Sequence, residues 1–347
     1  MSRYIVLIFT CLALASCREI SKPFVADRET AIYVVQHDLS VHGKVAAQTL
    51  QGGFSAKLFL VTTPDKKYVV RFLQEALHQN PNEIACLQIA SRAGYGPHVY
   101  STDREGRYVV MEYINSRPIT KEDRNSAKFY RALGDVLYKI HHGQDFPEKK
   151  EPLEWTKHDL VTLSQHESTK NIAARIQMLL PIVERPFSAI PDRAPCHNDL
   201  NPGNLLYTGD SFKVIDFETA GQSNPYFDIA TVIQFYCLTT KDENELLNAY
   251  FSRALTKEEA AKLFISKQAS RLWYAAVLLA ILPEVLSDPN LVTESYEEFV
   301  KKDTGKKFDV HRLALHFYKL ANHDIESPDF EQAIDTLKTS SSAQRHR

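Results

Sequence analysis

One short polar segment constrains this chain more than any other feature. It reads CHNDLNPGN at 196–204 and VIDFE at 214–218. Asn, Pro and Gly at this density exclude a helix interior, so the first stretch is expected to be a loop that presents side chains to a cleft. The second stretch is a short apolar strand that ends in an acidic residue. Three polar residues therefore stand at a workable spacing for one site: Asp199, Asn204 and Asp216.

The residue types in this segment suit the transfer of a phosphoryl group. Such a reaction needs a carboxylate beside the acceptor hydroxyl, a role that Asp199 can take as the base. It also needs hard oxygen ligands for Mg²⁺, which the Asn204 carbonyl and Asp216 can provide. The pattern H-x-D-x-x-x-x-N, followed by a strand that ends in Asp, has the spacing used by kinase-fold enzymes. That full spacing favours this interpretation over a plain Asx-rich turn.

The composition is that of a soluble globular protein. The 347 residues are 44% hydrophobic and 24% charged, enough for one large domain or two modest lobes around a core. A formal net charge of −2 argues against a broad nucleic-acid-binding surface, which usually needs an excess of basic residues. The apolar runs are too short for an ordinary membrane span.

The cysteines favour a reducing compartment. Beyond the N-terminal leader the chain has Cys86, Cys196 and Cys237, too few and too scattered for a disulfide framework. No C-x-x-C pair or His-x-x-x-His spacing indicates zinc. Cys196 lies beside His197 without a second such pair, so we interpret it as a small buried residue.

The N-terminus leaves three alternatives open. Arg3 precedes an apolar run at 4–15, which is too short to span a bilayer but suits the hydrophobic region of a signal peptide. The sequence LASC at 14–17 resembles the lipobox of bacterial lipoproteins, in which the cysteine becomes the acylated N-terminus. Acylated Cys17 would anchor the protein to a membrane. The other two readings are a misassigned start site and a buried N-terminal strand or helix.

Along the rest of the chain, strand patterns come first and helix patterns follow. The first part predicts strands and one inserted helix, at 58–63, 67–73, 80–94 (the helix, starting at Asn80-Pro81), 98–103 and 107–114. The second part predicts helices, the first capped by Thr120 with apolar residues from Phe129 to Ile140, and others at 171–183, 228–238, 257–267 and 269–286. The fold class is therefore α+β, with a small β-rich N-lobe, a larger helical C-lobe and a cleft between them.

These patterns divide the chain into five parts. We expect a signal peptide or its alternatives at 1–17, an N-terminal extension at 18–45, the nucleotide-binding N-lobe at 46–114, the catalytic and acceptor-binding C-lobe at 115–325, and a polar C-terminal tail at 326–347.

From about Leu50 to Val285 the chain resembles the choline/ethanolamine kinase branch of the aminoglycoside phosphotransferase superfamily. The resemblance rests on the polar segment, on NPYFDIA at 224–230 and on LQGGFSA at 50–56. It implies a bilobal protein-kinase-like fold, with ATP and Mg²⁺ as cofactors.

The resemblance also implies a set of nucleotide contacts. The stretch 50–56 is similar to the family's L-x-G-G-x-S-N loop, in which backbone N–H groups approach the phosphates; this carries over to Gly52, Gly53 and Ser55. The family's Asn is Ala56 here, so the contacts of this loop differ in part.

Two charged residues take places that the family uses for phosphate binding. Arg71 stands where protein kinases have a strand Lys, and a guanidinium can grip phosphate oxygens in a forked geometry. Glu83, on the next helix, is the natural partner that would hold Arg71. Taken singly, each could be an exposed surface charge.

The resemblance assigns further supporting roles. The stretch VMEYI at 110–114 is similar to the interlobe hinge, where the backbone of Glu112 and Ile114 would bond the adenine edge; a plain buried strand is the alternative. Asp228 is expected to bond the backbone of the catalytic loop, and His197 to orient that loop. His141 ends a helix and is interpreted as structural.

The acceptor is expected to be a small molecule. Glu218 replaces the glycine of D-F-G, and the chain lacks both an A-P-E segment and a G-x-G-x-x-G loop. A cationic alcohol needs a carboxylate and aromatic faces, for which Glu218 and Trp273 are the candidates. Core packing of Trp273 is an equal alternative, and Tyr274 is expected to face another way on its helix.

Four functional hypotheses follow. The first is an ATP-dependent kinase of choline or ethanolamine, with thiamine close behind because it is also cationic. An aminoglycoside kinase is third, and a nucleotide-binding pseudokinase or regulatory lipoprotein belongs to a different class. ATP chemistry and the free thiols favour the cytoplasm, with a membrane-anchored lipoprotein as the alternative. The oligomeric state is left open.

Overall fold

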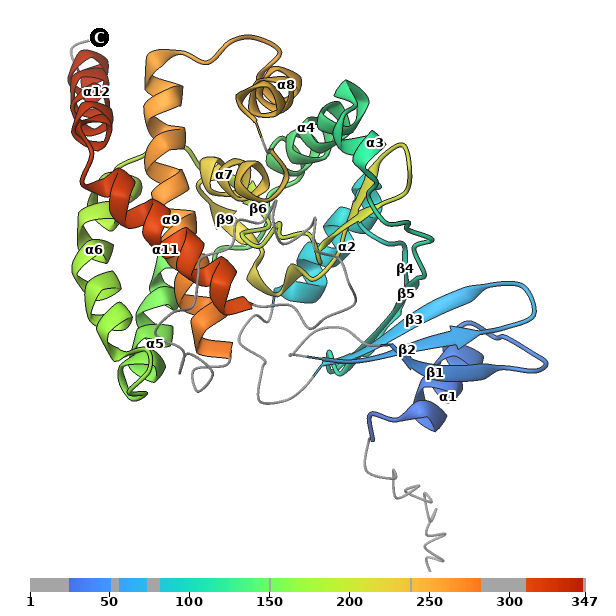
Figure 1. Cartoon of the computed structure of the whole chain (residues 1–347). Helices are drawn as coiled ribbons and strands as arrows, with labels where there is room; N and C mark the ends of the chain where they lie inside the picture. Colours follow the sequence, from blue (N-terminus) through green and yellow to red (C-terminus); the bar gives the residue numbers. More distant parts are fainter. Residues whose placement is uncertain are drawn as a thin grey trace, which may run out of the picture.

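The computed structural model describes residues 25–50, 56–73, 82–149, 151–237, 239–281 and 310–345. Figure 1 shows a small sheet at one end of the molecule and a larger group of helices at the other. Four predicted positions lie outside the described residues: Cys17, Gly52, Gly53 and Ser55. In the described part of the chain, no helix is both long enough and apolar enough to cross a membrane.

The N-lobe is built on one antiparallel sheet with the strand order β1-β2-β3-β5-β4. The strands are β1 (Ala46–Leu50), β2 (Ala56–Thr62), β3 (Lys67–Leu73), β4 (Val99–Thr102) and β5 (Tyr108–Glu112). A tight turn joins β2 to β3, in which the Thr63 N–H donates to the Lys66 carbonyl at 2.9 Å. The bounds predicted for β3 are confirmed.

The central strand β3 is covered on both faces. Tyr68, Val70 and Phe72 pack in one cluster with α1 (Arg28–Asp38), whereas Val69 packs in another cluster with α2 (Glu83–Ala93). Side chains alternate along a strand, so Arg71 shares the face of Val69 and points toward α2. Two-sided burial explains why β3 reads as an almost continuous apolar run.

Two N-lobe helices differ from expectation. The segment 18–45 was expected only as an extension, but it contains α1, whose N-cap Asp27 accepts the Thr30 N–H at 2.8 Å. Helix α2 begins at Glu83 with Asn82 as its N-cap, so the predicted start at Asn80-Pro81 was wrong. The prediction misplaced it because Asn-Pro imitates a cap followed by a proline at the first helical position.

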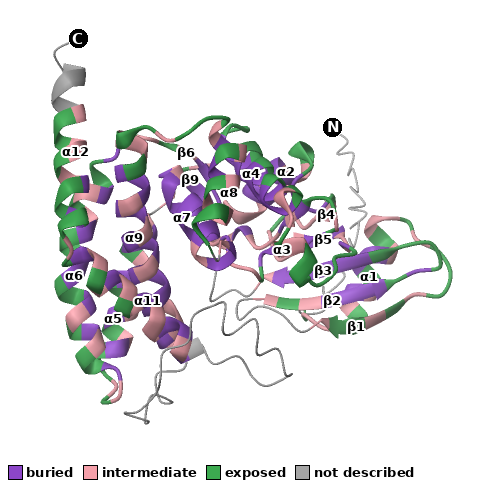
Figure 2. Cartoon of the chain, turned by 45° about the horizontal axis from the view of Figure 1, so that its top comes forward, coloured by how far each residue is buried: buried purple, intermediate pink, exposed green. Residues whose placement is uncertain are grey.

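The C-lobe is organised around one long central helix. It contains α3 (Lys121–Arg124), α4 (Ala127–His141), α5 (Pro152–Ser164), α6 (Lys170–Ser188), α7 (Pro225–Tyr236), α8 (Thr240–Phe251), α9 (Lys257–Ile281), α11 (Val310–Ile325) and α12 (Pro328–Arg345). Helix α9 contacts α5, α6, α7, α11 and α12. Buried residues follow α7 and α9 in Figure 2.

Three predicted boundaries in the C-lobe were wrong. Residues 257–281 form one helix, because Gln268 is buried inside α9 and donates to the Phe264 carbonyl at 3.1 Å instead of breaking the helix. Thr120 caps the short α3, and Ser126 caps α4. The expected tail 326–347 contains α12, whose buried Phe330 and Ala333 stand at helical spacing on the side that meets α9.

Two small two-stranded sheets hold the polar segment in the C-lobe. Strand β6 (Ala194–Cys196) pairs with β9 (Gly221–Ser223), and β7 (Leu205–Tyr207) pairs with β8 (Phe212–Val214). The loop 197–204 connects β6 to β7, and the 3₁₀ turn η2 (Phe217–Thr219) connects β8 to β9. The sheet pairing therefore brings the two halves of the motif next to each other.

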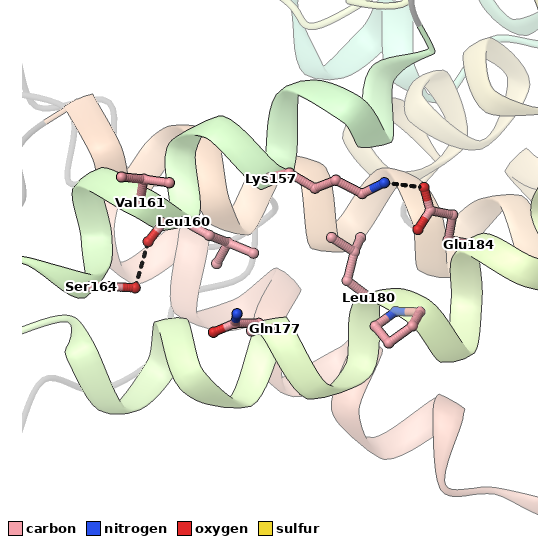
Figure 3. A pocket seen from close by; sticks show the side chains of 8 residues that line it. Lys157, Leu160, Val161, Ser164, Gln177, Leu180 and Glu184 are labelled. Atoms are coloured by element: carbon pink, nitrogen blue, oxygen red, sulfur yellow. Dashed lines mark hydrogen bonds and ion pairs between the residues drawn. The ribbon is translucent and has the colours of Figure 1, made fainter.

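A surface groove lies elsewhere, between α5 and α6 (Figure 3). Lys157 of α5 and Glu184 of α6 form an ion pair of 2.7 Å across it. None of the residues predicted for the site lines this groove.

Candidate active site

The catalytic loop is anchored by a buried carboxylate at the start of α7. Asp228 accepts the backbone N–H of His197 at Oδ2 and that of Asn198 at Oδ1, both at 2.7 Å. The contact predicted between Asp228 and the loop backbone is confirmed. Asn198 has a left-handed backbone with φ of 65°, a conformation that Asn tolerates better than most residues. The two bonds hold this turn in place.

His197 connects the loop to the strand that precedes Asp216. Its Nδ1 accepts the Asp199 N–H at 3.3 Å, so Nε2 carries the proton and donates to the Ile215 carbonyl at 2.9 Å. Thr219 also donates from its hydroxyl to the His197 carbonyl at 2.8 Å. Both ring nitrogens are used within the protein, as expected for a histidine that orients the loop.

Asp199 is surrounded by donors. Its Oδ1 accepts from the Tyr274 hydroxyl at 2.6 Å and from Asn201 Nδ2 at 2.8 Å, and its Oδ2 accepts from Asn204 Nδ2 at 3.0 Å. Since each carboxylate oxygen has two lone pairs, these bonds leave one of them on Oδ2. Burial raises the pKa of Asp199 above its ordinary value. A half-buried carboxylate with a free lone pair suits a base that accepts one hydroxyl proton.

Asn204 and Asp216 are adjacent and can serve as metal ligands. The Asn204 amide donates to the Asp199 carbonyl at 2.9 Å and to Oδ2, so its own Oδ1 has no part in these bonds. The Ile215 N–H donates to the Asn204 backbone carbonyl at 3.0 Å, which places Asn204 beside Asp216. An amide oxygen and a carboxylate are ligands that Mg²⁺ prefers, so the residues present fit the predicted ion.

Arg71 connects the N-lobe to this site. It forms ion pairs with Glu83 at 2.7 Å and Asp216 at 2.9 Å, and its Nη2 lies 4.0 Å from Glu218. The predicted Arg71–Glu83 pair is therefore present, with both side chains at most 12% exposed. Burial opposes the positive charge of Arg71, but Asp216 and Glu83 outweigh it and raise the Arg71 pKa. Burial also raises the pKa of Glu83, to about 7.

The predicted hinge residues lie at the end of β5. The Glu112 N–H donates to the His98 carbonyl at 2.8 Å, and the Glu112 carboxylate accepts the His98 N–H at 3.1 Å. The Ile114 carbonyl accepts the Ser116 N–H at 2.9 Å. These bonds fix the path of the chain between the lobes. Adenine binding by Glu112 and Ile114 stays a prediction.

The aromatic residue that reaches the site is Tyr274, not Trp273. Trp273 is 6% exposed and packs edge-to-face against Phe227, which supports the core-packing alternative over an aromatic wall. The expectation that Tyr274 faces elsewhere was wrong. Tyr274 is held by edge-to-face packing against Phe235, and its hydroxyl bonds Asp199. Helical spacing alone could not show which face of α9 meets a loop that lies far away in sequence.

Sequence reasoning also missed Lys149. Its ammonium donates to the Glu218 carbonyl and lies 4.8 Å from the centre of the Trp155 ring. Burial lowers the pKa of Lys149 to about 8. Glu218 itself is 40% exposed at the side chain, as a substrate contact requires. The surrounding PEKKEP sequence reads as an ordinary charged loop, so nothing in it indicated this position.

A second group of potential metal ligands lies beneath the loop. Ligand atoms of His141, Cys196 and Asp228 are all within 4.8 Å of one another. His141 bonds the Tyr250 hydroxyl at 2.8 Å and Asp228 at 3.3 Å, which agrees with its predicted structural role. Burial raises the pKa of Cys196 well above its ordinary value. Because His141 and Asp228 bond each other, Tyr250 and the loop backbone, we interpret the group as a packed support for the loop.

A family comparison decides how this arrangement is classified. The profile of the phosphotransferase enzyme family, APH, matches residues 46–264. The chain belongs to this family. The match covers both the N-lobe sheet and the loop that carries Asp199, so the family resemblance is confirmed.

Curated relatives of this phosphotransferase include small-molecule kinases. Ethanolamine kinase 2 of Mus musculus is 26% identical over 166 residues, which are 45% of this chain and 42% of that protein. The chain thus matches less than half the length of this relative. Thiamine kinase of Escherichia coli is 26% identical over 218 residues, which are 59% of this chain and 71% of that protein.

Solved structures confirm the expected bilobal kinase-like fold. The choline/ethanolamine kinase family protein from Mesorhizobium loti has a TM-score of 0.66 at 19% identity, over 90% of this chain and 99% of that chain. LicA in complex with AMP has a TM-score of 0.59 at 18% identity, over 86% of this chain and 97% of that chain. At such identities the likeness shows the fold alone.

Proposed function

We propose that this phosphotransferase moves the γ-phosphoryl group of ATP to the hydroxyl of a small cationic alcohol, with choline or ethanolamine as the leading candidates. The observation that carries the proposal is the arrangement around Asp199. The half-buried Asp199 carboxylate has one lone pair free on Oδ2, and Asn204 bonds that same oxygen. The proton acceptor therefore stands beside the residue proposed to bind the metal.

Each residue of the site would have its own role in the reaction. Asp199 would accept the proton of the acceptor hydroxyl as that oxygen attacks the γ-phosphorus and the bond to the β-phosphate oxygen breaks. Arg71 would bind the remaining phosphates through its planar guanidinium. Asn204 and Asp216 would hold Mg²⁺, which supplies neutralisation of phosphate charge.

Two features support a cationic acceptor. Glu218 is a partly exposed carboxylate two residues after Asp216, and an opposite charge at this place would attract an ammonium group. The named activities of the curated relatives, ethanolamine kinase and thiamine kinase, both concern cationic alcohols. Thiamine is a close second candidate, because thiamine kinase matches 59% of this chain, against 45% for ethanolamine kinase. An aminoglycoside is a third.

The test is ADP release from Mg–ATP with choline, ethanolamine, thiamine and an aminoglycoside as acceptors, each compared with Asp199→Ala. We expect one cationic alcohol to stimulate turnover well above the variant. If no acceptor in the panel does so while the protein still binds ADP, the pseudokinase alternative replaces this proposal.

We also propose a cytoplasmic site of action, because ATP is abundant there and Cys86, Cys196 and Cys237 are free thiols. The test is incorporation of labelled palmitate into the full chain. Label that disappears in Cys17→Ala would instead establish a lipoprotein.

A further inference from the structure

Four charged side chains gather around Asp216, and together with Asp216 we call them the charge cluster. They are Arg71, Glu83, Lys149, Asp216 and Glu218. Three carboxylates therefore face two cations. Arg71 approaches all three carboxylates, whereas Lys149 donates to the Glu218 backbone carbonyl and lies close enough for the charges of Glu218, Glu83 and Asp216 to act on it.

The backbone aims Lys149 at this cluster. The Gln222 N–H donates to the Pro147 carbonyl at 3.2 Å, and Glu148 forms an isolated bridge with Gln222. A Cβ added at Gly221 would lie only 2.5 Å from the Lys149 Cβ, so this close approach depends on glycine. Strand β9 thus fixes the position of Lys149 from one side.

The same short segment also contacts α2. Asn82, the N-cap of α2, donates from its side chain to the Glu148 carbonyl at 3.3 Å. Glu83 is the next residue, at the first position of the helix. Segment 147–149 therefore lies between the start of α2, which carries Glu83, and the chain that follows Asp216.

We propose that Lys149 is a positioning residue that docks the start of α2 against the segment after Asp216 and so keeps Glu83 facing Arg71. Without Lys149, three carboxylates would share one guanidinium, and repulsion would bear most on the poorly solvated Glu83, which would favour turning it away. Arg71 would then lose one of the two carboxylates that fix its orientation. This inference rests on the proposed function, because its consequence is weaker binding of the ATP phosphates.

Trp155 strengthens the assignment. The centre of the indole ring lies 4.8 Å from the ammonium of Lys149 and offers it a favourable surface in place of lost water.

Lys157, two residues after Trp155 on α5, differs from Lys149 in its surroundings. It is 46% exposed and pairs with Glu154 and Glu184 at the surface, away from the cluster. Lys157 is therefore a matched control for the loss of a lysine charge.

The experiment compares Lys149→Met, Lys149→Arg and Lys157→Met in the full chain. We expect Lys149→Met to lower kcat/KM for ATP about tenfold while the acceptor KM stays within about twofold. Lys149→Arg should recover most of the loss, and Lys157→Met should match the wild type. Hydrogen exchange gives the second readout: amides of α2 and η2 should lose protection in Lys149→Met alone.

The outcomes separate the docking role of Lys149 from the proposed phosphoryl transfer. If Lys149→Met equals Lys157→Met in both kcat/KM and exchange, the inference is wrong. If wild-type protein phosphorylates no acceptor but α2 still loses protection in Lys149→Met, the docking role stands and the proposed function fails. Should Lys149→Met not fold, Lys149→Gln serves with the same expected results, because it removes the charge and keeps a polar N–H donor on a shorter side chain.

Discussion

Two regions next to the catalytic loop stabilise their carboxylates differently. One is the support formed by His141, Cys196 and Asp228, and the other is the charge cluster. In the support, Asp228 is fully buried and bonded by two backbone N–H groups and His141. In the charge cluster, the carboxylates of Glu83, Asp216 and Glu218 are countered in part by Arg71 and Lys149. Directional donors fix geometry in the first region, and opposite charges balance one another in the second. We therefore expect damage to the support to unfold the protein, and damage to the cluster to disturb its activity.

The largest effect is expected at Asp199, which the support holds in place but which does chemistry. Asp199→Asn should lower kcat by roughly 10²–10⁴-fold, because an amide cannot accept the hydroxyl proton. Its free energy of unfolding should fall by less than that of Asp228→Asn, because the Asn201 and Asn204 amides and the Tyr274 hydroxyl can reorient to accept from the new NH₂ group, which backbone N–H groups cannot do. Steady-state kinetics and urea unfolding check both values. Asp210→Asn, at an exposed site, should change neither.

Asp228→Asn should show the reverse pattern. Either orientation of the amide places an NH₂ group against a backbone N–H, because both carboxylate oxygens accept one at 2.7 Å. The free energy of unfolding should fall by about 3–5 kcal/mol, the usual cost of breaking a buried charged network. Urea unfolding measures this loss. A stable variant with normal activity would contradict the distinction between the two regions.

The variant Glu83→Gln tests the charge cluster through the pH dependence of the free energy of unfolding. Burial raises the pKa of Glu83 to about 7, above its ordinary value of 4.5, so the folded protein binds the extra proton between these two values. Glu83 therefore makes the wild type less stable as pH rises through this window. The free energy of unfolding, wild type minus Glu83→Gln, should fall by at most about 3 kcal/mol between pH 4.5 and 7.5. A flat difference would show that Arg71 fully offsets the burial.

The smallest effect is expected for Tyr274→Phe, which removes one of the donors to Asp199 without touching either region. The variant should lower kcat roughly three- to tenfold, less than the full value of a bond to a charged group, because Asn201 still donates to the same carboxylate oxygen. Tyr95→Phe is the control, because the Tyr95 hydroxyl is buried with no hydrogen-bond partner in the described part of the chain. Equal kinetics for the two variants would remove Tyr274 from the site.

Local patterns predicted what depends on neighbours in sequence. The alternation of side chains predicted the bounds of β3. The spacing of the polar segment predicted that Asp199, Asn204 and Asp216 share one site. Family motifs placed Asp228 and the Arg71–Glu83 pair. Contacts between distant segments were beyond such patterns.

Tyr274 and Lys149 were missed for this reason. Tyr274 meets a carboxylate 75 residues away, on a face of α9 that helical spacing could not select. Lys149 reaches Glu218 across 69 residues because β9 approaches closely at Gly221. The boundaries of α9 and α12 failed for a related reason, since packing between helices stabilises sequences that look interrupted or polar.

The backbone itself limits how this site can change over time. Asn198 and Asp216 both have left-handed φ angles, 65° and 66°. Among residues with a Cβ, Asn and Asp enter that region at the least cost. A Glu at 216 would keep the charge and still carry a conformational penalty, so sequence drift from Asp to Glu is disfavoured even before its longer reach to a metal matters. The preference for Asp at position 216 therefore reflects the left-handed backbone there as well as the chemistry of the side chain.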